Sequence, residues 1–232
     1  MRPSRRFKDS IYEQIARIGK ALAAPKRLEL LDLLCEGPRT VEALARLASL
    51  SVANASQHLR VLHHARLVVA EKHGLFVEYG ISDERLPKYL HLTQELAEAR
   101  FTEIREMTNA FLERRGSLRR LSSEELLQRV RSGEVTILDV RPAEEYQAGH
   151  LPGARSVPLA ELGARMRELP RNREIVAYCR GRYCVMAIEA VEQLRKAGYR
   201  AHRMEYGVRD WRVRGWRVEK ISARPQEMGS RS

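Results

Sequence analysis

Residues 174–184 read Glu-Ile-Val-Ala-Tyr-Cys-Arg-Gly-Arg-Tyr-Cys, a largely apolar run that ends directly on a cysteine and its loop. The first part, residues 174–178, predicts a buried strand. Apolar spacing predicts a helix from Val185 to Ala197, directly after the loop. This strand-loop-helix unit places the thiol of Cys179 in a concave loop that ends on a second thiol, Cys184.

Strands and helices alternate on both sides of this unit. Buried strands are predicted at residues 135–140 and near residues 201–205. Helical spacing lies at residues 122–131, with Ser122 as the cap, and at residues 159–169. Such alternation is typical of an α/β domain with a largely parallel sheet.

Before residue 115 the pattern is mostly helical. Apolar residues recur every three or four positions through residues 9–63, which predicts successive helices. Thr40 is expected to cap one of them, Ser49-Leu50-Ser51 breaks it, and residues 52–63 resume helical spacing. Two helices joined by a tight turn are the predicted result.

The next segment predicts a β-hairpin, residues 67–81, with His73-Gly74 at its turn. A long helix from Leu86 to about Arg115 closes this half. Helix, turn, helix and hairpin together are the winged helix-turn-helix pattern, in which the second helix enters the major groove of DNA.

The helix at residues 52–63 is amphipathic, as a helix that contacts DNA bases must be. Ala55, Leu59 and Leu62 are expected to face inward. An ordinary amphipathic helix in an all-α domain is the alternative interpretation. The side chains predicted to contact bases or phosphates are Asn54, Ser56, Gln57, His58 and Arg60 on the helix and Lys72 and His73 at the hairpin tip.

Composition excludes several classes of protein. Among the 232 residues, 44% are hydrophobic, and no apolar run approaches the roughly 18 residues of a membrane helix. The basic N-terminus lacks the apolar centre of a signal peptide, so we expect a cytoplasmic protein that has no membrane contact. Three cysteines are too few for a disulfide framework, which makes reactive thiols the better interpretation. The net charge of +12 suggests a polyanionic partner.

Two stretches resemble the ArsR family of winged-helix repressors: residues 21–31, Ala-Leu-Ala-Ala-Pro-Lys-Arg-Leu-Glu-Leu-Leu, and residues 54–62, Asn-Ala-Ser-Gln-His-Leu-Arg-Val-Leu. The resemblance covers roughly residues 9–105. It implies a homodimer, formed through the first and last helices of this half, that binds a double-stranded DNA operator. Many members hold metals through a cysteine pair or through Asp and His residues. Such a set is missing here, so no metal and no cofactor are expected.

The loop after residue 178 has the chemistry of an activated thiol. Backbone amides at the loop and at the helix start are expected to point toward the sulfur of Cys179, and Arg180 and Arg182 add positive charge. The sequence therefore predicts a lowered pKa for Cys179 and a basic rim that attracts thiosulfate or polysulfide. Gly181 is expected to permit the tight curvature of the loop.

Four separated segments in the right order resemble the rhodanese family over residues 121–218. They are residues 138–141 with Glu145 and Tyr146 after them, residues 149–154, the cysteine loop and residues 206–211. The resemblance implies that Cys179 takes a sulfane sulfur as a persulfide and passes it to an acceptor thiol or cyanide. It also gives roles to the other loop residues, Arg180, Gly181, Arg182 and Tyr183, and to Asp139 and Arg141, which would support the loop from the neighbouring strand.

Two departures refine this interpretation. A phosphatase-like loop needs an arginine six positions after its cysteine, where this chain has Val185, so phosphate chemistry is disfavoured. The loop ends on Cys184 instead of Ser or Thr. A second thiol could convert a persulfide on Cys179 into a disulfide or a sulfur-bridged link.

The predicted fold class is therefore α+β with two domains: a mostly α winged helix-turn-helix, and an α/β rhodanese-like parallel sheet flanked by helices. A weakly apolar stretch at residues 114–120 marks the boundary. The domains are residues 9–113, a linker at 114–120, residues 121–220 and a tail at 221–232.

The favoured function is a transcriptional regulator, a repressor, in which sulfur modification of Cys179, with Cys184 as partner, changes operator affinity through the linker at 114–120. Its other partners are a sulfane-sulfur donor and a thiol acceptor, and sulfurtransferase activity is expected at Cys179. Two alternatives stay open. The chain is a sulfurtransferase whose DNA-binding half acts without cross-talk, or its second domain binds an anion or a partner protein without turnover.

Overall fold

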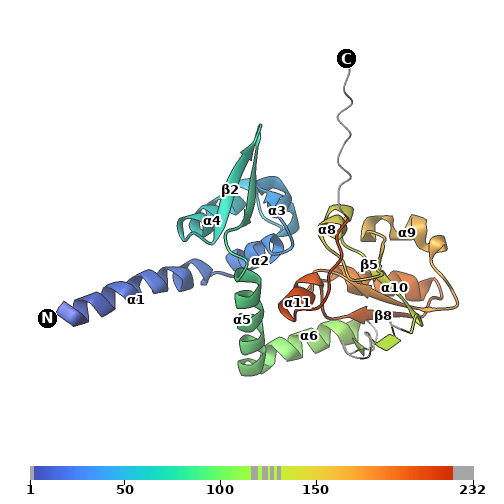
Figure 1. The fold of residues 1–232 in the computed structure, drawn as a ribbon. Helices are drawn as coiled ribbons and strands as arrows, with labels where there is room; N and C mark the ends of the chain where they lie inside the picture. The colour runs from blue at the N-terminus through green and yellow to red at the C-terminus, as the bar shows by residue number, and fades with distance from the viewer. Residues whose placement is uncertain (1–2, 116–119, 122–124, 126–127, 130–131, 222–232) are drawn as a thin grey trace, which may run out of the picture. The chain divides into compact units, whose positions relative to one another are not determined.

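The structure is a computed structural model that describes residues 3–115, 120–121, 125, 128–129 and 132–221 (Figure 1). Contacts between residues divide the chain into two compact units, Met1–Leu96 and Ala97–Ser232. Each unit contains its own cluster of buried hydrophobic side chains. No helix in the described ranges combines the length and the apolar character needed to cross a membrane.

The first unit is mostly helical, with a small antiparallel sheet. Within the described residues the sheet has three strands in the order β1-β3-β2, and β2 and β3 form the hairpin. The elements are α1 (Pro3–Leu22), α2 (Pro25–Leu34), β1 (Arg39–Thr40), α3 (Val41–Leu47), α4 (Val52–His64), β2 (Val68–His73), β3 (Phe76–Ile81) and α5 (Leu86–Arg100), which continues into the second unit.

Local signals explain where the two helices of the helix-turn-helix begin. The Ala43 N–H donates to Thr40 Oγ1 at 3.3 Å, which caps α3. The Asn54 N–H donates to Ser51 Oγ at 3.2 Å, which caps α4. The predicted inner face of α4 is confirmed, since its three apolar side chains, Ala55, Leu59 and Leu62, are buried. Burial of that face leaves the polar side of α4 at the surface.

The second unit contains a parallel sheet. Among the described residues the sheet has five strands in the order β4-β8-β7-β5-β6, and every strand pair is parallel. The elements are α6 (Thr102–Arg114), β4 (Arg120–Leu121), β5 (Val135–Asp139), α8 (Ala143–Ala148), β6 (Arg155–Ser156), a 3-10 turn at Leu159–Glu161, α9 (Leu162–Arg165), a 3-10 turn at Met166–Glu168, β7 (Glu174–Tyr178), α10 (Met186–Lys196), β8 (Ala201–Met204) and α11 (Val208–Val213).

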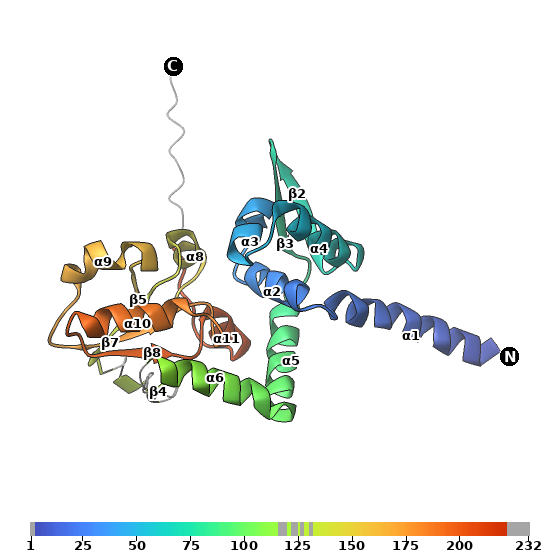
Figure 2. The ribbon, with the colours of Figure 1, turned by 180° about the vertical axis from the view of Figure 1, so that it is seen from behind.

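Both faces of this sheet are covered, as a parallel sheet requires. Along β7, Ile175 and Ala177 belong to a cluster with apolar residues of α10, whereas Val176 and Tyr178 belong to a cluster with Trp211 of α11. The alternation follows from the two-residue period of a strand. Figure 2 shows α10 lying across β7 and β8. This packing fixes the carboxyl end of β7, where the cysteine loop starts.

The structure corrects one expected helix. The single helix predicted from Leu86 to about Arg115 is wrong, because Phe101 has an extended backbone (φ −114°, ψ 99°) that separates α5 from α6. No glycine or proline marks the break. Phe101 and Thr102 both lose rotamer freedom in a helix, which favours an interruption there. The helical stretch predicted around residues 159–169 is confirmed as three short consecutive helical turns.

Two other predictions concern residues that the structure describes only in part. The helix expected at residues 122–131 and the linker expected at 114–120 lie largely outside the described residues. The division of contacts places α6 with the second unit, and Leu112 of α6 belongs to that unit's core. The boundary at 114–120 stays a prediction.

Candidate functional site

The segment Cys179–Cys184, called the sulfur loop below, leaves the carboxyl end of β7 and leads into α10. Register places Asp139, the last residue of β5, beside Tyr178, the last residue of β7. The carboxyl ends of two neighbouring parallel strands therefore meet at the loop, the position at which ligand sites of parallel α/β sheets usually form.

Two glycines allow the tight backbone around the sulfurs. Gly181 has φ +142°, a conformation that side chains disfavour, and a Cβ there would meet Asp210 Oδ2 at 3.3 Å. Gly207 follows β8 and packs directly on the loop, since its Cβ would lie 2.5 Å from the carbonyl carbon of Arg180. The Gly207 N–H donates to Asp210 Oδ2 at 2.8 Å, which holds this second segment in place.

The Cys179 thiol donates to the Cys184 carbonyl oxygen at 3.4 Å, and a hydrogen bond between the two thiol side chains is among the causes of their pKa shifts. Cys179 is only 2% exposed, whereas Cys184 is partly exposed. Burial raises the pKa of Cys179 well above its ordinary value, and the hydrogen bond with Cys184 adds to this effect. The same hydrogen bond lowers the pKa of Cys184 to about 6, with help from the backbone amides of Met186 and Arg180.

The sequence-based expectation of a lowered pKa for Cys179 is therefore wrong. Backbone amides of Ala187 and Gly181 do act on its sulfur as expected, but burial outweighs them. The two pKa shifts have opposite directions, which favours the proton on Cys179 and the thiolate on Cys184. Sequence alone could not give this result, because it depends on which of two nearby sulfurs is more buried.

The positive rim expected around the loop is largely neutralised. The Arg180 guanidinium donates to both carboxylate oxygens of Glu145 at 2.6 to 3.1 Å, and both side chains are mostly buried. Arg182 forms an ion pair with Glu98, and the Tyr183 hydroxyl donates to the other oxygen of the same carboxylate. The two arginines thus hold the loop more than they attract anions.

A buried polar network supports the loop from β5. Arg141 donates to both carboxylate oxygens of Asp139 and to the Gly149 carbonyl, the latter at 2.7 Å. The Tyr178 hydroxyl donates to Asp139 Oδ2 at 2.5 Å and accepts from the Leu151 N–H at 3.1 Å. Burial and the nearby Asp139 carboxylate raise the pKa of Tyr178 far above its ordinary value, so it stays a donor.

Sequence reasoning missed several residues of this site. Glu145 was noted only as part of a motif, and Glu98 and Gly207 were not connected to the loop. Arg203 of β8 donates twice to the Arg182 carbonyl, at 3.2 Å each, and is buried. An arginine within a strand predicted to be buried, near residues 201–205, was the local signal that could have indicated it.

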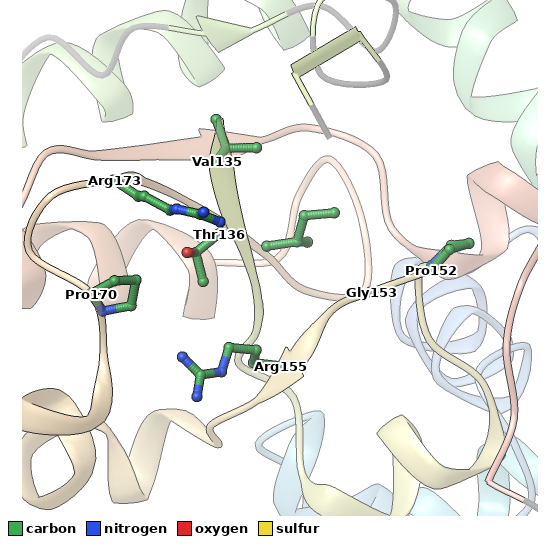
Figure 3. Close-up of a pocket in the computed structure, with 8 residues that line it drawn as sticks. Val135, Thr136, Pro152, Gly153, Arg155, Pro170 and Arg173 are labelled. Atoms are coloured by element: carbon green, nitrogen blue, oxygen red, sulfur yellow. The ribbon is translucent and has the colours of Figure 1, made fainter. Parts of the chain in front are cut away.

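Two cavities lie in the second unit. One, of about 290 Å³, borders the sulfur loop at Arg182, Tyr183 and Val185 and is otherwise lined mainly by apolar residues of α6. The other, of about 320 Å³, lies at the amino end of β5, away from the loop. Figure 3 shows Thr136, Arg155 and Arg173 directed toward this second pocket.

The polar residues predicted for DNA contact lie along α4 and the hairpin. Asn54, Gln57 and Arg60 are exposed, whereas Ser56 and His58 are half-buried. Lys72 and His73 are exposed at the end of β2. His73 Nε2 lies 3.7 Å from Glu71 and 3.6 Å from Glu78, so carboxylates surround this side of the hairpin tip.

Family models match two parts of the chain. Residues 24–69 match the bacterial regulatory protein, arsR family, and residues 122–214 match the rhodanese-like domain. The HTH-type transcriptional regulator Rv0324 of Mycobacterium tuberculosis is 42% identical over 214 residues, which cover 92% of this chain and 93% of that protein.

The chain belongs to the arsR family of helix-turn-helix regulators. It also carries a rhodanese-like domain in its second half. The fold class predicted from sequence is confirmed, with a helical winged domain and a parallel α/β domain. DNA binding and transcription regulation follow from this membership.

Shorter matches cover each half of this arsR-family regulator. A sulfurtransferase of Allochromatium vinosum is 32% identical over 97 residues, 41% of this chain and 89% of that protein. The solution structure of a homodimeric winged helix-turn-helix DNA-binding domain from Mycobacterium bovis is 37% identical, covers 40% of this chain and 87% of that chain, and has a TM-score of 0.39.

Histidines and cysteines of the regulator do not gather into a metal site within the described residues, where no group of three or more His, Cys, Asp or Glu is placed to hold an ion. His91 is buried, and its Nε2 lies 3.1 Å from Glu95 Oε1, one turn along α5. Cys35 is buried in the apolar core of the first unit.

Proposed function

We propose that this regulator senses sulfane sulfur: Cys179 accepts a sulfur atom as a persulfide, Cys184 completes a switch, and the change alters operator affinity. The observation that carries the proposal is the pairing of two free cysteines in one loop at the end of β7, where the Cys179 thiol donates to the Cys184 carbonyl at 3.4 Å. It joins an acid and a base in one buried pair, and such a pair can activate a nucleophile.

The first step is a proton transfer within the pair. Cys184 carries the negative charge at neutral pH and accepts the proton of Cys179 across their hydrogen bond. This transfer converts Cys179 to a thiolate while the total charge of the pair stays the same. Backbone amides of Ala187 and Gly181 stabilise that thiolate.

The second step forms the persulfide. The Cys179 thiolate attacks the sulfane sulfur of thiosulfate, the sulfur-sulfur bond of the donor breaks, and sulfite leaves with the electron pair. A polysulfide donor reacts in the same way and leaves as a polysulfide shorter by one sulfur. An acceptor thiol that takes the outer sulfur completes a sulfurtransferase turnover.

The third step sets the switch. Cys184, deprotonated again through solvent, attacks Sγ of the persulfidated Cys179, so that a bond forms between the two Sγ atoms and hydrosulfide leaves. The pair is oxidised to a disulfide at the expense of the sulfane sulfur, which is reduced. Four residues separate the two cysteines, so closing this link constrains the whole sulfur loop.

The DNA-binding half supports the other part of the proposal. Exposed polar side chains of α4 are available for base edges and phosphates. Dimerisation through the first and last helices is favoured by apolar faces that a single chain leaves exposed: Phe7, Ile11, Tyr12, Ile15 and Ile18 on α1, and Tyr89, Leu92 and Leu96 on α5.

The test measures operator binding and sulfur content on the same samples. The full-length protein, reduced or treated with inorganic polysulfide, is titrated into a DNA fragment selected from random sequence by the reduced form, and its intact mass is recorded. We expect wild type to gain a sulfur atom or lose two hydrogens while its affinity changes about tenfold.

Three variants give the controls. Cys179→Ser is expected to bind DNA when reduced and to ignore the donor in both measurements. Cys184→Ser is expected to stop at the persulfide and to show at most a partial affinity change. Cys35→Ala, which removes a buried cysteine of the first unit, is expected to respond like wild type. An adduct on wild type with unchanged affinity would instead indicate a sulfurtransferase without cross-talk.

A further inference from the structure

Glu98 lies at the point where α5 meets the sulfur loop. Its two carboxylate oxygens accept hydrogen bonds from two consecutive loop residues, one from the Arg182 guanidinium and one from the Tyr183 hydroxyl. Arg182 and Glu98 are each about three-quarters buried, with side chains 24% exposed. A bidentate arrangement in a partly dehydrated place is stronger and more specific than a surface ion pair.

The loop is also held from its other side. Buried Arg203 of β8 donates to the Arg182 carbonyl through both terminal nitrogens, at 3.2 Å each. Residue 182 is thus fixed through its backbone by the sheet and through its side chain by Glu98. Both residues that contact Glu98 lie between Cys179 and Cys184, so a change in the link between the sulfurs acts directly on them.

Helix α5 connects this carboxylate with the winged-helix core. Leu86 and Leu90, in its first turns, belong to the hydrophobic cluster of the first unit. Gln94 Nε2 donates to Asp32 Oδ1 of α2 at 3.3 Å. Gln94 and Glu98 are four residues apart and so share one face of α5. One helix face therefore bears a bond to the winged-helix domain and, one turn later, a bond to the sulfur loop.

The cavity beside the loop gives the contacting residues room to move. Tyr183 and Arg182 line it together with Ile104 and Met107 of α6, and its volume is about 290 Å³. A close-packed interior resists such movement, whereas an open, mainly apolar pocket of this size can accept a displaced ring.

We propose that Glu98 is the positioning residue that couples the state of the Cys179–Cys184 pair to α5, by holding Arg182 and Tyr183 in the reduced loop and releasing them when the sulfurs become linked. This inference rests on the sulfur-sensing function proposed above and identifies the residue through which the change in the sulfur pair reaches α5. When Arg182 and Tyr183 no longer bind Glu98, the C-terminal end of α5 loses its attachment to the sulfur loop. Because α5 also packs on the winged-helix core, this loss is transmitted to the DNA-binding domain.

The experiment compares Glu98→Gln with a matched control, Glu106→Gln, which removes the same charge from an exposed position of α6. Wild type and both variants, all full-length, are treated with inorganic polysulfide, and intact mass, thermal unfolding and affinity for the selected operator are measured. The amide keeps the size of the side chain but loses the charge and one of the two acceptors.

We expect all three proteins to fold and to gain the same sulfur modification, and Glu98→Gln to unfold at a somewhat lower temperature because Arg182 loses its carboxylate partner. Wild type and Glu106→Gln are expected to change operator affinity about tenfold on treatment, and Glu98→Gln less than about threefold. A merely structural role would alter the sulfur modification as well as the coupling. If the operator affinity of Glu98→Gln and of wild type changes equally on treatment, the role of Glu98 is overturned, whereas the sulfur-sensing function is not. An unresponsive wild type would overturn the sulfur-sensing function itself and the coupling with it.

Discussion

Helix α4 and the sulfur loop differ in what surrounds their basic side chains. On α4, Arg60 is exposed and lies beside other exposed polar residues. In the sulfur loop, Arg180 is bound by Glu145 and Arg182 by Glu98. Arginine therefore has a different role on α4 than in the sulfur loop. A solvated cation is available to a polyanion, whereas a paired and buried cation fixes the backbone around it.

This difference bears on how each region selects its partner. DNA carries many phosphates, so exposed cations bind it through a summed field. The sulfur loop instead stabilises one sulfur at a time, with backbone amides and a shared proton. This difference can be tested in two ways. One removes the carboxylates that pair with the loop arginines, and the other removes exposed cations from α4 and the hairpin.

The largest effect is expected where a buried pair is broken. Glu145→Gln leaves the buried Arg180 without a carboxylate, and Arg141 Nη1, 4.0 Å from Glu145, loses a nearby negative charge. We expect the free energy of unfolding of the second domain to fall by about 3 kcal/mol in urea denaturation. Glu144→Gln, an exposed neighbour, is the matched control and should change it by less than about 0.5 kcal/mol. Equal effects of the two variants would contradict a buried role for this pair.

The next effect concerns the sulfur pair. Cys179→Ala removes the hydrogen bond that is the main cause of the lowered pKa of Cys184, so that pKa should rise from about 6 toward its ordinary 9.0. Thiolates alkylate and thiols do not, so in wild type the rate at Cys184 rises as pH passes through about 6. In Cys179→Ala the midpoint moves to higher pH, and the rate at pH 7 falls at least about tenfold.

Iodoacetamide labelling of Cys184, followed by peptide mass over a pH series, gives both midpoints. Cys35→Ala serves as the control, because Cys35 is buried in the other unit and its loss leaves the sulfur pair intact. A midpoint near 6 in Cys179→Ala would show that the amides of Met186 and Arg180 suffice to lower the pKa of Cys184.

In the region predicted to contact DNA, Arg60→Ala removes an exposed cation from α4. We expect operator binding to weaken by about 1–3 kcal/mol, as for an arginine at a base or phosphate. Lys88→Ala on α5 loses the same charge from an exposed position outside α4 and is expected to bind like wild type. Fluorescence anisotropy with the selected fragment measures both. Equal losses would point to net charge instead of a contact from α4.

The comparison also shows what sequence can predict. The DNA face depends on local patterns, such as the spacing of Ala55, Leu59 and Leu62, and these were predicted correctly because a helix fixes its faces within four residues. The position of the cysteine loop after β7 was equally local. The ion pair of Arg182 with Glu98 joins residues 84 positions apart, and no local pattern indicates it.

The sulfur chemistry was the harder part for a physical reason. The position of the charge within the Cys179–Cys184 pair depends on a balance between burial, amide hydrogen bonds and nearby charges. Sequence shows that the amides and arginines are near, but it does not show that Glu145 and Glu98 neutralise the arginines. Those partners come from α8 and α5, which only the fold brings to the loop.

The smallest effect is expected at the hairpin tip. Lys72 is exposed there, but Glu71 and Glu78 lie near the neighbouring His73 and repel phosphate. Lys72→Ala should therefore weaken operator binding by less than about 1 kcal/mol and lower the salt dependence slightly, as one lost phosphate contact does. Glu71→Gln should have the opposite sign, because it removes repulsion without adding a cation. Titrations at two salt concentrations separate these outcomes. A loss for Lys72→Ala as large as that for Arg60→Ala would mean that the hairpin tip binds DNA as strongly as α4, in spite of its carboxylates.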